Sequence, residues 1–157
     1  MTYYLRLDQI DGESTVRGHA KWFELTGLAW GVHHSSGPGR GGGAGVGRAV
    51  LDPLQVTLAG SRSTPLLFQA VATGRNIATA TLDVVASGEQ PRSILKWDLQ
   101  DVALTALQLS GEGGAPLVET LSLSYAKITL TSTGQDPKGA VSPGTVAGWD
   151  LTRNSAI

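Results

Sequence analysis

The stretch Ile94–Leu109, ILKWDLQDVALTALQL, decides the fold, because apolar and polar residues alternate along most of its length. A period of two places one face of a β-strand against a core and the other face toward solvent. The apolar side changes once within the stretch: Leu95, Trp97 and Leu99 come first, followed by Val102, Leu104 and Ala106. The change of phase near Asp101 predicts either a β-bulge or a strand that passes from one packing environment into another.

A second long segment, Val118–Thr131, changes phase in the same way. Its apolar side is formed first by Leu121, Leu123 and Tyr125, and then by Ala126, Ile128 and Leu130. Strands of this length commonly serve two surfaces, such as a subunit core and an interface. Shorter segments alternate at 3–7, 54–58 and 82–86, and 21–32 is apolar on both faces, as in a central strand that can bulge at Gly27.

One helix is predicted among these strands, in the stretch STPLLFQAVATG at 63–74. Thr64 is the expected N-cap, Pro65 takes the first helical position, and Gly74 lies just past the end. Apolar residues follow helical spacing at Leu67, Ala70 and Val71, with Phe68 beside them. So short a helix must dock on the sheet. We therefore predict a mainly β domain over residues 1–157, a β-barrel or β-sandwich of antiparallel strands with one short flanking α-helix.

Composition excludes several classes of function. The 157 residues include no cysteine, so disulfides, thiol nucleophiles and cysteine zinc sites are absent. The formal net charge is −1 with both signs interspersed, which argues against a nucleic-acid partner. No apolar run approaches the roughly 20 residues of a membrane span, and the first ten residues do not read as a secretory signal. We expect synthesis in the cytoplasm, no membrane insertion, and any export by a route that accepts the folded protein.

The segment 37–47 holds seven glycines in eleven residues, and Gly37, Gly39 and Gly42 spell GxGxxG. A dinucleotide-binding fingerprint must open a helix, whereas these glycines lead into a strand pattern that contains Pro53. A single Arg-Gly-Gly at 40–42 is not the repetitive segment that binds RNA. The ordinary interpretation is a mobile glycine loop at about 35–48.

No other group of residues forms a convincing active site. His33 and His34 are adjacent and would point to opposite faces of a strand, so they cannot easily share a metal ion. The acidic residues at 8, 11 and 13 do not have EF-hand spacing, and no G-x-S-x-G motif exists. The four tryptophans fit a core, although one or two can anchor a subunit interface. We expect no enzyme activity, no catalytic or metal-binding residues and no cofactor.

Taken in order, the segments of the chain resemble one known family. They are IDGES (10–14), WFELTGLAWGV (22–32), GGGAGVGRA (41–49), STPLLFQAVATGRNIATATLDV (63–84), LKWDLQDVALTALQLSG (95–111), ETLSLSYAKITLTST (119–133) and AGWDLTRN (147–154). Together they resemble the haemolysin-coregulated protein (Hcp) family, the inner-tube proteins of bacterial type VI secretion systems. The most specific pieces are LFQAVATG, SLSYAKI and AGWD. The chain departs from the family at Leu66, where a polar or charged residue is frequent, and in its richer glycine segment.

The resemblance implies a β-barrel related to phage tail-tube proteins. Six subunits would close into a ring with a central pore, and rings would stack into a tube inside a contractile sheath. The implied partners are other copies of the chain and the sheath, spike and effector proteins, with small effectors carried or chaperoned in the pore. The implied destination is outside the cell, through type VI secretion. Alternation alone assigns no pore-lining residues, because two faces and two environments compete.

Two sets of contact residues follow from the resemblance. A loop between rings or subunits would contain Gly37, Gly39, Arg40, Gly41, Gly42, Gly43, Gly45 and Arg48. The helix would contact the neighbouring subunit through Leu66, Leu67, Phe68 and Val71. Two alternatives stay open: the inner tube of a phage tail or other contractile injection particle, and a β-barrel that binds a small molecule or phosphate through the glycine loop. The neighbouring genes distinguish the first alternative from a type VI tube. A thermal-shift screen with nucleotides tests the second alternative.

Overall fold

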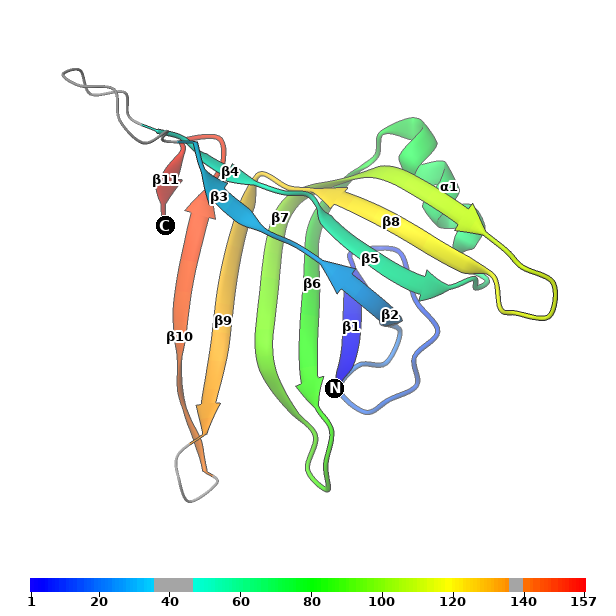
Figure 1. The fold of residues 1–157 in the computed structure, drawn as a ribbon, viewed down its shortest axis with the longest axis horizontal. Coiled ribbons are helices and arrows are strands. Elements are labelled where there is room, and N and C mark those ends of the chain that lie inside the picture. The colour runs from blue at the N-terminus through cyan, green and yellow to red at the C-terminus, as the bar shows by residue number, and fades with distance from the viewer. Residues whose placement is uncertain (36–46, 136–139) are drawn as a thin grey trace.

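The computed structural model describes residues 1–35, 47–135 and 140–157, which form eleven strands and one helix (Figure 1). The strands are β1 Thr2–Leu7, β2 Phe23–Ala29, β3 Val32–His34, β4 Ala49–Leu51, β5 Leu54–Ala59, β6 Asn76–Ala86, β7 Arg92–Ser110, β8 Val118–Ser124, β9 Lys127–Gln135, β10 Val141–Asp150 and β11 Ser155–Ala156. The helix α1 spans Thr64–Thr73. The predicted mainly β fold with one short helix is confirmed.

The main sheet closes on itself to form a barrel. Its strands follow the order β11-β10-β9-β7-β6-β1-β2-β5-β8, and β8 also pairs with β7. Strands β7, β6, β1, β2, β5 and β8 therefore form a closed circle, from which β9, β10 and β11 continue as a side sheet. All these pairings are antiparallel. Closure leaves no free strand edge within the circle.

Strand β7 is 19 residues long and belongs to both the barrel and the side sheet. Along one edge its first part pairs with β9, as in Leu99 opposite Ile128, and its second part pairs with β8, as in Leu104 opposite Leu123. Between the two parts, Asp101 adopts a positive φ of 51°. The break between β8 and β9 lies opposite, where the Ala126 N–H donates to the Gln100 carbonyl at 3.0 Å. The two predicted phase changes therefore lie opposite each other, one on β7 and one at the break between β8 and β9.

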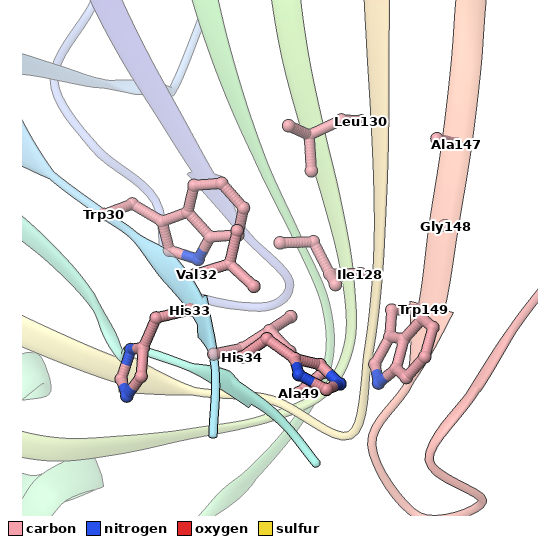
Figure 2. A pocket seen from close by; sticks show the side chains of 11 residues that line it. Trp30, Val32, His33, His34, Ala49, Ile128, Leu130, Ala147, Gly148 and Trp149 are labelled. Carbon is pink, nitrogen blue, oxygen red and sulfur yellow. The ribbon is translucent and has the colours of Figure 1, made fainter. Parts of the chain in front are cut away.

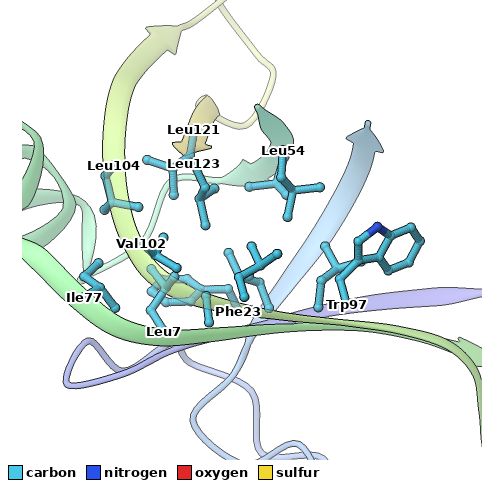
Figure 3. Close-up of a cluster of buried hydrophobic side chains, with 14 of the residues drawn as sticks. Leu7, Phe23, Leu54, Ile77, Trp97, Val102, Leu104, Leu121 and Leu123 are labelled. Carbon is cyan, nitrogen blue, oxygen red and sulfur yellow. The ribbon is translucent and has the colours of Figure 1, made fainter. Parts of the chain in front are cut away.

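The irregularity at Asp101 lets both halves of β7 bury their apolar side chains in one core. Trp97 and Leu99 precede it and Val102 and Leu104 follow it, and all four are buried. Of the two predicted explanations, the change of packing environment is confirmed, because β7 changes its partner there from β9 to β8. A β-bulge is not found at Asp101, because the pairing of β7 with β6 keeps one register across it. Figure 3 shows side chains from strands around the barrel meeting inside it: Leu7, Phe23, Leu54, Ile77, Trp97, Val102, Leu104, Leu121 and Leu123.

Two details of the strand prediction were wrong or incomplete, and a third is confirmed. Segment 118–131 is two strands, because the chain breaks its ladder at Tyr125–Ala126. Ala106 is exposed rather than inward-facing, because a further register shift after Leu104 turns Leu107 toward the core instead. The expected irregularity at Gly27 is confirmed as a register shift between β2 and β5.

The helix α1 packs its Leu67 and Ala70 into the core. Gly74 ends it in the left-handed conformation, with φ 63°, as predicted. The predicted N-cap is wrong: Ser63 holds that position without a side-chain cap, and Thr64 is already helical. The Thr64 hydroxyl instead accepts a hydrogen bond from the Ser61 N–H and donates one to Glu119 of β8. The first turn has no acidic residue of its own, and the fully buried carboxyl group of Glu119 lies beside the helix N-terminus through its contact with Thr64.

The C-terminal end is held by a turn around Asp150, which is buried at the end of β10. Its carboxylate accepts hydrogen bonds from the Thr152 hydroxyl at 2.5 Å, the Thr152 N–H at 2.9 Å and the Arg153 N–H at 3.3 Å. The Thr152 hydroxyl, these N–H groups and the charge of Lys127 lower the pKa of Asp150, against the opposing effect of burial. The turn brings Ser155 back to pair with Asp150, so β11 can form.

The irregularity at Asp101 predicts a graded response to substitution. Asp101→Gly should change the free energy of unfolding by less than about 1 kcal/mol, because glycine accepts a positive φ. Asp101→Val should cost about 1–2 kcal/mol, because a β-branched residue is strained there. Deleting Asp101 should prevent folding, because it shifts the pairing of Val102 with Ile77, and of the residues next to them on β7 and β6, by one position. Urea unfolding followed by tryptophan fluorescence measures all three, and a valine variant as stable as wild type would contradict this role for Asp101.

The turn around Asp150 predicts an acid-sensitive contribution to stability. A lowered pKa in the folded state means that Asp150 stabilises the protein above its ordinary pKa of 3.8, and that this contribution is lost as the pH falls through the lower folded value. Asp150→Asn should therefore lower the melting temperature at pH 6, and the difference from wild type should shrink toward pH 2. Glu112→Gln, at an exposed position between β7 and β8, is the control. A difference that does not depend on pH would refute the prediction.

Candidate functional site

A hairpin formed by β3 and β4 continues β2 and β5 beyond the barrel (Figure 1). We call residues 30–35 and 47–52 the arm. Its ladder pairs Val32 with Leu51 and His34 with Ala49, and the Ser35 N–H donates to the Arg48 carbonyl at 3.0 Å. Arg48 is exposed on the arm. The other predicted loop residues lie outside the described residues: Gly37, Gly39, Arg40, Gly41, Gly42, Gly43 and Gly45.

The base of the arm is tied to the barrel by Tyr125, which is buried at the break between β8 and β9. The Trp30 Nε1–H donates to the Tyr125 hydroxyl at 2.6 Å, and that hydroxyl donates to the Asp52 carbonyl at 2.8 Å. Burial raises the pKa of Tyr125; the hydrogen bond from Trp30 opposes this shift and the charge of Asp52 adds to it. The neutral phenol thus joins both strands of the arm to the strand break.

An apolar hollow of about 540 Å³ lies between the arm and the side sheet, and we call it the arm groove. Figure 2 shows the side chains of Trp30, Val32 and His34 on one side and those of Ile128, Leu130 and Trp149 on the other. Leu51, His33, Ala49, Ala147 and Gly148 complete the lining. Trp30 also packs edge-on against Trp97 of the core, with ring centres 6.2 Å apart. Two of the four tryptophans, Trp30 and Trp149, therefore line an open surface.

A second apolar hollow, of about 570 Å³, lies between α1 and the end of β7, and we call it the helix groove. Its lining is Thr64, Pro65, Phe68, Val71, Ala72, Leu107 and Leu109. Phe68 is 65% exposed and Leu109 is 53% exposed. In Figure 1, α1 and the arm lie at opposite ends of the long axis of the molecule. The two grooves therefore belong to different ends of the subunit.

The four predicted helix contacts divide into three environments. Phe68 and Val71 line the helix groove, and Leu66 is exposed beside it. Leu67 is fully buried in the core. Any effect of Leu67 on assembly would therefore act through the stability of the subunit. Helical spacing grouped Leu67 with Ala70, and both are buried; the resemblance, however, assigned Leu67 to the neighbouring subunit together with the exposed Phe68.

A buried polar cluster that the sequence did not reveal holds the segment 11–22 on the barrel. The His19 Nε2 lies 2.8 Å from the Asp83 carboxylate, and the Ser93 hydroxyl donates to the other oxygen of Asp83 at 2.5 Å. The His19 ring stacks on Tyr4, with centres 4.2 Å apart. Ser93 contacts Asp83 and not His19, so no base is paired with a nucleophile here. His19 and Asp83 are 64 residues apart in the chain, which is why no local motif marks them.

Among the described residues, His, Asp and Glu side chains form no group of three that could hold a metal ion. No helix among the described residues is long and apolar enough to cross a membrane. The two exposed apolar grooves are the features that require explanation.

Comparisons with known proteins agree on one family. The family model described as "Type VI secretion system effector, Hcp" matches residues 4–131. A solved structure described as a type six secretion system protein is 29% identical, with a TM-score of 0.91 over 99% of both chains. Hcp1 from Salmonella typhimurium is 25% identical, with a TM-score of 0.80 over 99% of this chain and 98% of that one.

A type VI secretion system effector from Yersinia pestis, at 19% identity, shares the fold with a TM-score of 0.78 over 94% of this chain and 98% of that one. No match was found among curated proteins. The match to the family model covers most of the chain, including the barrel, α1 and the break between β8 and β9. The chain belongs to the Hcp family of type VI secretion systems.

Proposed function

We propose that this protein is the structural subunit of a type VI inner tube, in which six copies close head to tail into a ring and rings stack. The observation that carries the proposal is the pair of unlike apolar grooves at opposite ends of the subunit. A ring built from one repeated contact needs two different, complementary surfaces, whereas a two-fold dimer uses one surface twice. The helix groove of one copy would meet the arm groove of the next.

The side chains in the two grooves suit such a contact. Interface centres are enriched in aromatic residues and depleted of charged ones. The helix groove offers Phe68 and Leu109, and the arm groove offers Trp30 and Trp149. Neither lining includes an Asp, Glu, Lys or Arg. Contact between the grooves would remove exposed apolar area from water at about 25 cal/mol per Å² before the costs of association.

The glycine segment 37–47 joins the two strands of the arm, and we propose that it reaches the next subunit or ring. Glycine allows close approach of its backbone to a partner. Fixing each such residue costs about 1–2 kcal/mol, so a single contact would be weak and a tube would need many at once. Arg40 and the exposed Arg48 are the proposed polar anchors. The remaining partners are the sheath, the spike and small effectors carried in the pore, and the tube is secreted with them.

The proposed ring predicts that Phe68→Glu separates assembly from folding. Phe68 is 65% exposed, so the change should alter the free energy of unfolding by less than about 0.5 kcal/mol. It should nevertheless reduce the mass in solution from six subunits to one, because each interface would bury an unpaired charge. Light scattering and negative-stain electron microscopy give the mass and the shape.

Gln69→Glu, on the same helix but outside the groove lining, is the matched control and should keep rings. Leu67→Ala, in the core, should lower stability by about 2–5 kcal/mol and so shows what a folding defect looks like. Intact six-membered rings from Phe68→Glu would rule out the helix groove as a subunit contact. A wild-type protein that stays monomeric at all concentrations would argue against the ring itself.

Deletion of Gly39–Gly45 predicts a different defect. Rings should still form, because both grooves are kept, whereas stacked tubes should become rare. Electron microscopy at protein concentrations where wild type forms tubes measures the fraction of stacked rings. Replacing the same seven residues by a Gly-Ser segment of equal length is the control for loop length. A deletion variant that stacks as readily as wild type would show that the segment does not join rings.

A further inference from the structure

A third hollow, of about 470 Å³, lies over the face of β1 and β6 that is turned away from the core, and we call it the turn pocket. Thr2 of β1 and Val85 of β6 lie opposite each other in its floor, and Val85 in turn lies opposite Ser93 of β7. Its rim is formed by two turns, one at 16–19 and one at 86–92. Pockets that bind small molecules have volumes of roughly 300–1,000 Å³. The turn pocket therefore has the size of a ligand site.

The turn at 16–19 places two side chains at the pocket. The His19 N–H donates to the Val16 carbonyl at 2.9 Å, and Gly18 adopts a positive φ of 86°, which favours glycine at the third position of such a turn. Arg17 and His19, on either side of Gly18, both line the pocket. Arg17 is exposed, whereas the His19 side chain is only 15% exposed. Arg17 therefore adds an accessible positive charge to the rim, and His19 forms part of an inner wall.

His19 is held in one orientation by the barrel. Its ring stacks on Tyr4 with centres 4.2 Å apart, and its Nε2 lies 2.8 Å from the Asp83 carboxylate. The other oxygen of Asp83 accepts the hydrogen bond of the Ser93 hydroxyl. An ionised carboxylate only accepts hydrogen bonds, so the Nε2–H of His19 is the donor in this pair. Asp83 is 5% exposed and does not line the pocket, so it positions the wall from behind.

The lining of the turn pocket contains two arginines and no acidic residue. Arg17 comes from the first turn, and Arg92, at the start of β7, comes from the second. Glu89 lies in the second turn and Glu24 lies opposite Tyr4 on β2, but neither lines the pocket. Guanidinium groups keep their charge at physiological pH, and their paired N–H donors match the two oxygens of a carboxylate. The lining therefore favours an anion.

Apolar groups also line the turn pocket, among them Val16, Val85, Pro91 and the ring of Tyr4. Positive charges in a concave site with apolar walls attract an anion more strongly than the same charges on an open surface. The arm groove and the helix groove differ, because neither is lined by an arginine or a lysine. A molecule with an anionic end and an apolar body therefore fits the turn pocket better than it fits either groove.

We propose that the turn pocket binds a small organic acid. The carboxylate of the ligand lies between Arg17 and Arg92, and its apolar body rests against Val85 and the Tyr4 ring. Because such a ligand contacts both turns of the rim in the folded state only, its binding should stabilise the folded subunit by mass action. The site shares no lining residue with either groove, so the proposal does not depend on the ring.

The first test compares phenylacetate with phenylacetamide, which has the same ring and nearly the same shape but no charge. The chain has three histidines, so NMR of their ring signals during each titration locates the binding. Phenylacetate should shift the His19 signal, leave those of His33 and His34 in the arm groove unchanged, and bind at least about tenfold more tightly than phenylacetamide. Equal affinities overturn the proposal, as do shifts confined to His33 and His34. No response of His19 at about 20 mM phenylacetate, where a millimolar site would be almost filled, also overturns it.

Arginine variants test the role of the two guanidinium groups. Arg17→Gln and Arg92→Gln should each weaken phenylacetate binding at least about tenfold, because each removes a charge-assisted contact. Arg17 is exposed, so Arg17→Gln should fold even where Arg92→Gln does not. Arg153→Gln, exposed at the C-terminal turn, is the matched control and should bind like wild type. Unchanged affinity in either pocket variant that folds overturns the proposal, as does acetate, which lacks the apolar body, if it binds as tightly as phenylacetate.

Discussion

Strand β7 is shared between the barrel and the side sheet, and the rest of the structure depends on the paired irregularities that allow this sharing. Asp101 takes a positive φ on β7, and the partner chain breaks opposite it at Tyr125–Ala126. Because both sides of the ladder are interrupted at one level, the pairing resumes with apolar side chains again directed inward. One strand therefore extends from the side sheet that lines the arm groove to the helix groove.

The same break also positions the arm. Tyr125 occupies it and accepts a hydrogen bond from Trp30 while donating one to the Asp52 carbonyl. The arm groove and the helix groove are thus fixed to opposite parts of a single β7–β8–β9 unit. A subunit that presents two apolar surfaces in a defined relation can repeat one contact until the ring closes. The polar pair of His19 and Asp83 lies apart from this frame, on β6, where it holds the segment 11–22 on the barrel.

The sequence predicted what local pattern determines. Alternation identified the strands, the phase changes marked the two irregular positions, and Gly74 marked the end of the helix. It did not show that the two phase changes face each other, because register between distant segments is set by the closed barrel. The Thr64 N-cap was wrong because Glu119, 55 residues away, engages that hydroxyl. Helical spacing grouped Leu67 with Ala70, both of which are buried, but it did not show that Phe68 is exposed in an open groove against the end of β7.

The central claim is that the helix groove of one subunit meets the arm groove of the next, and cross-linking tests it most directly. Ala72→Cys and Ala147→Cys place one cysteine in each groove of a chain that otherwise has none. Treated with a short bis-maleimide, the double variant should give a ladder of covalently linked species that ends at six subunits. Each single variant should give no covalently linked species. Dimers from either single variant would mean that like surfaces meet, and an unlinked double variant in assembled rings would mean that the grooves do not meet.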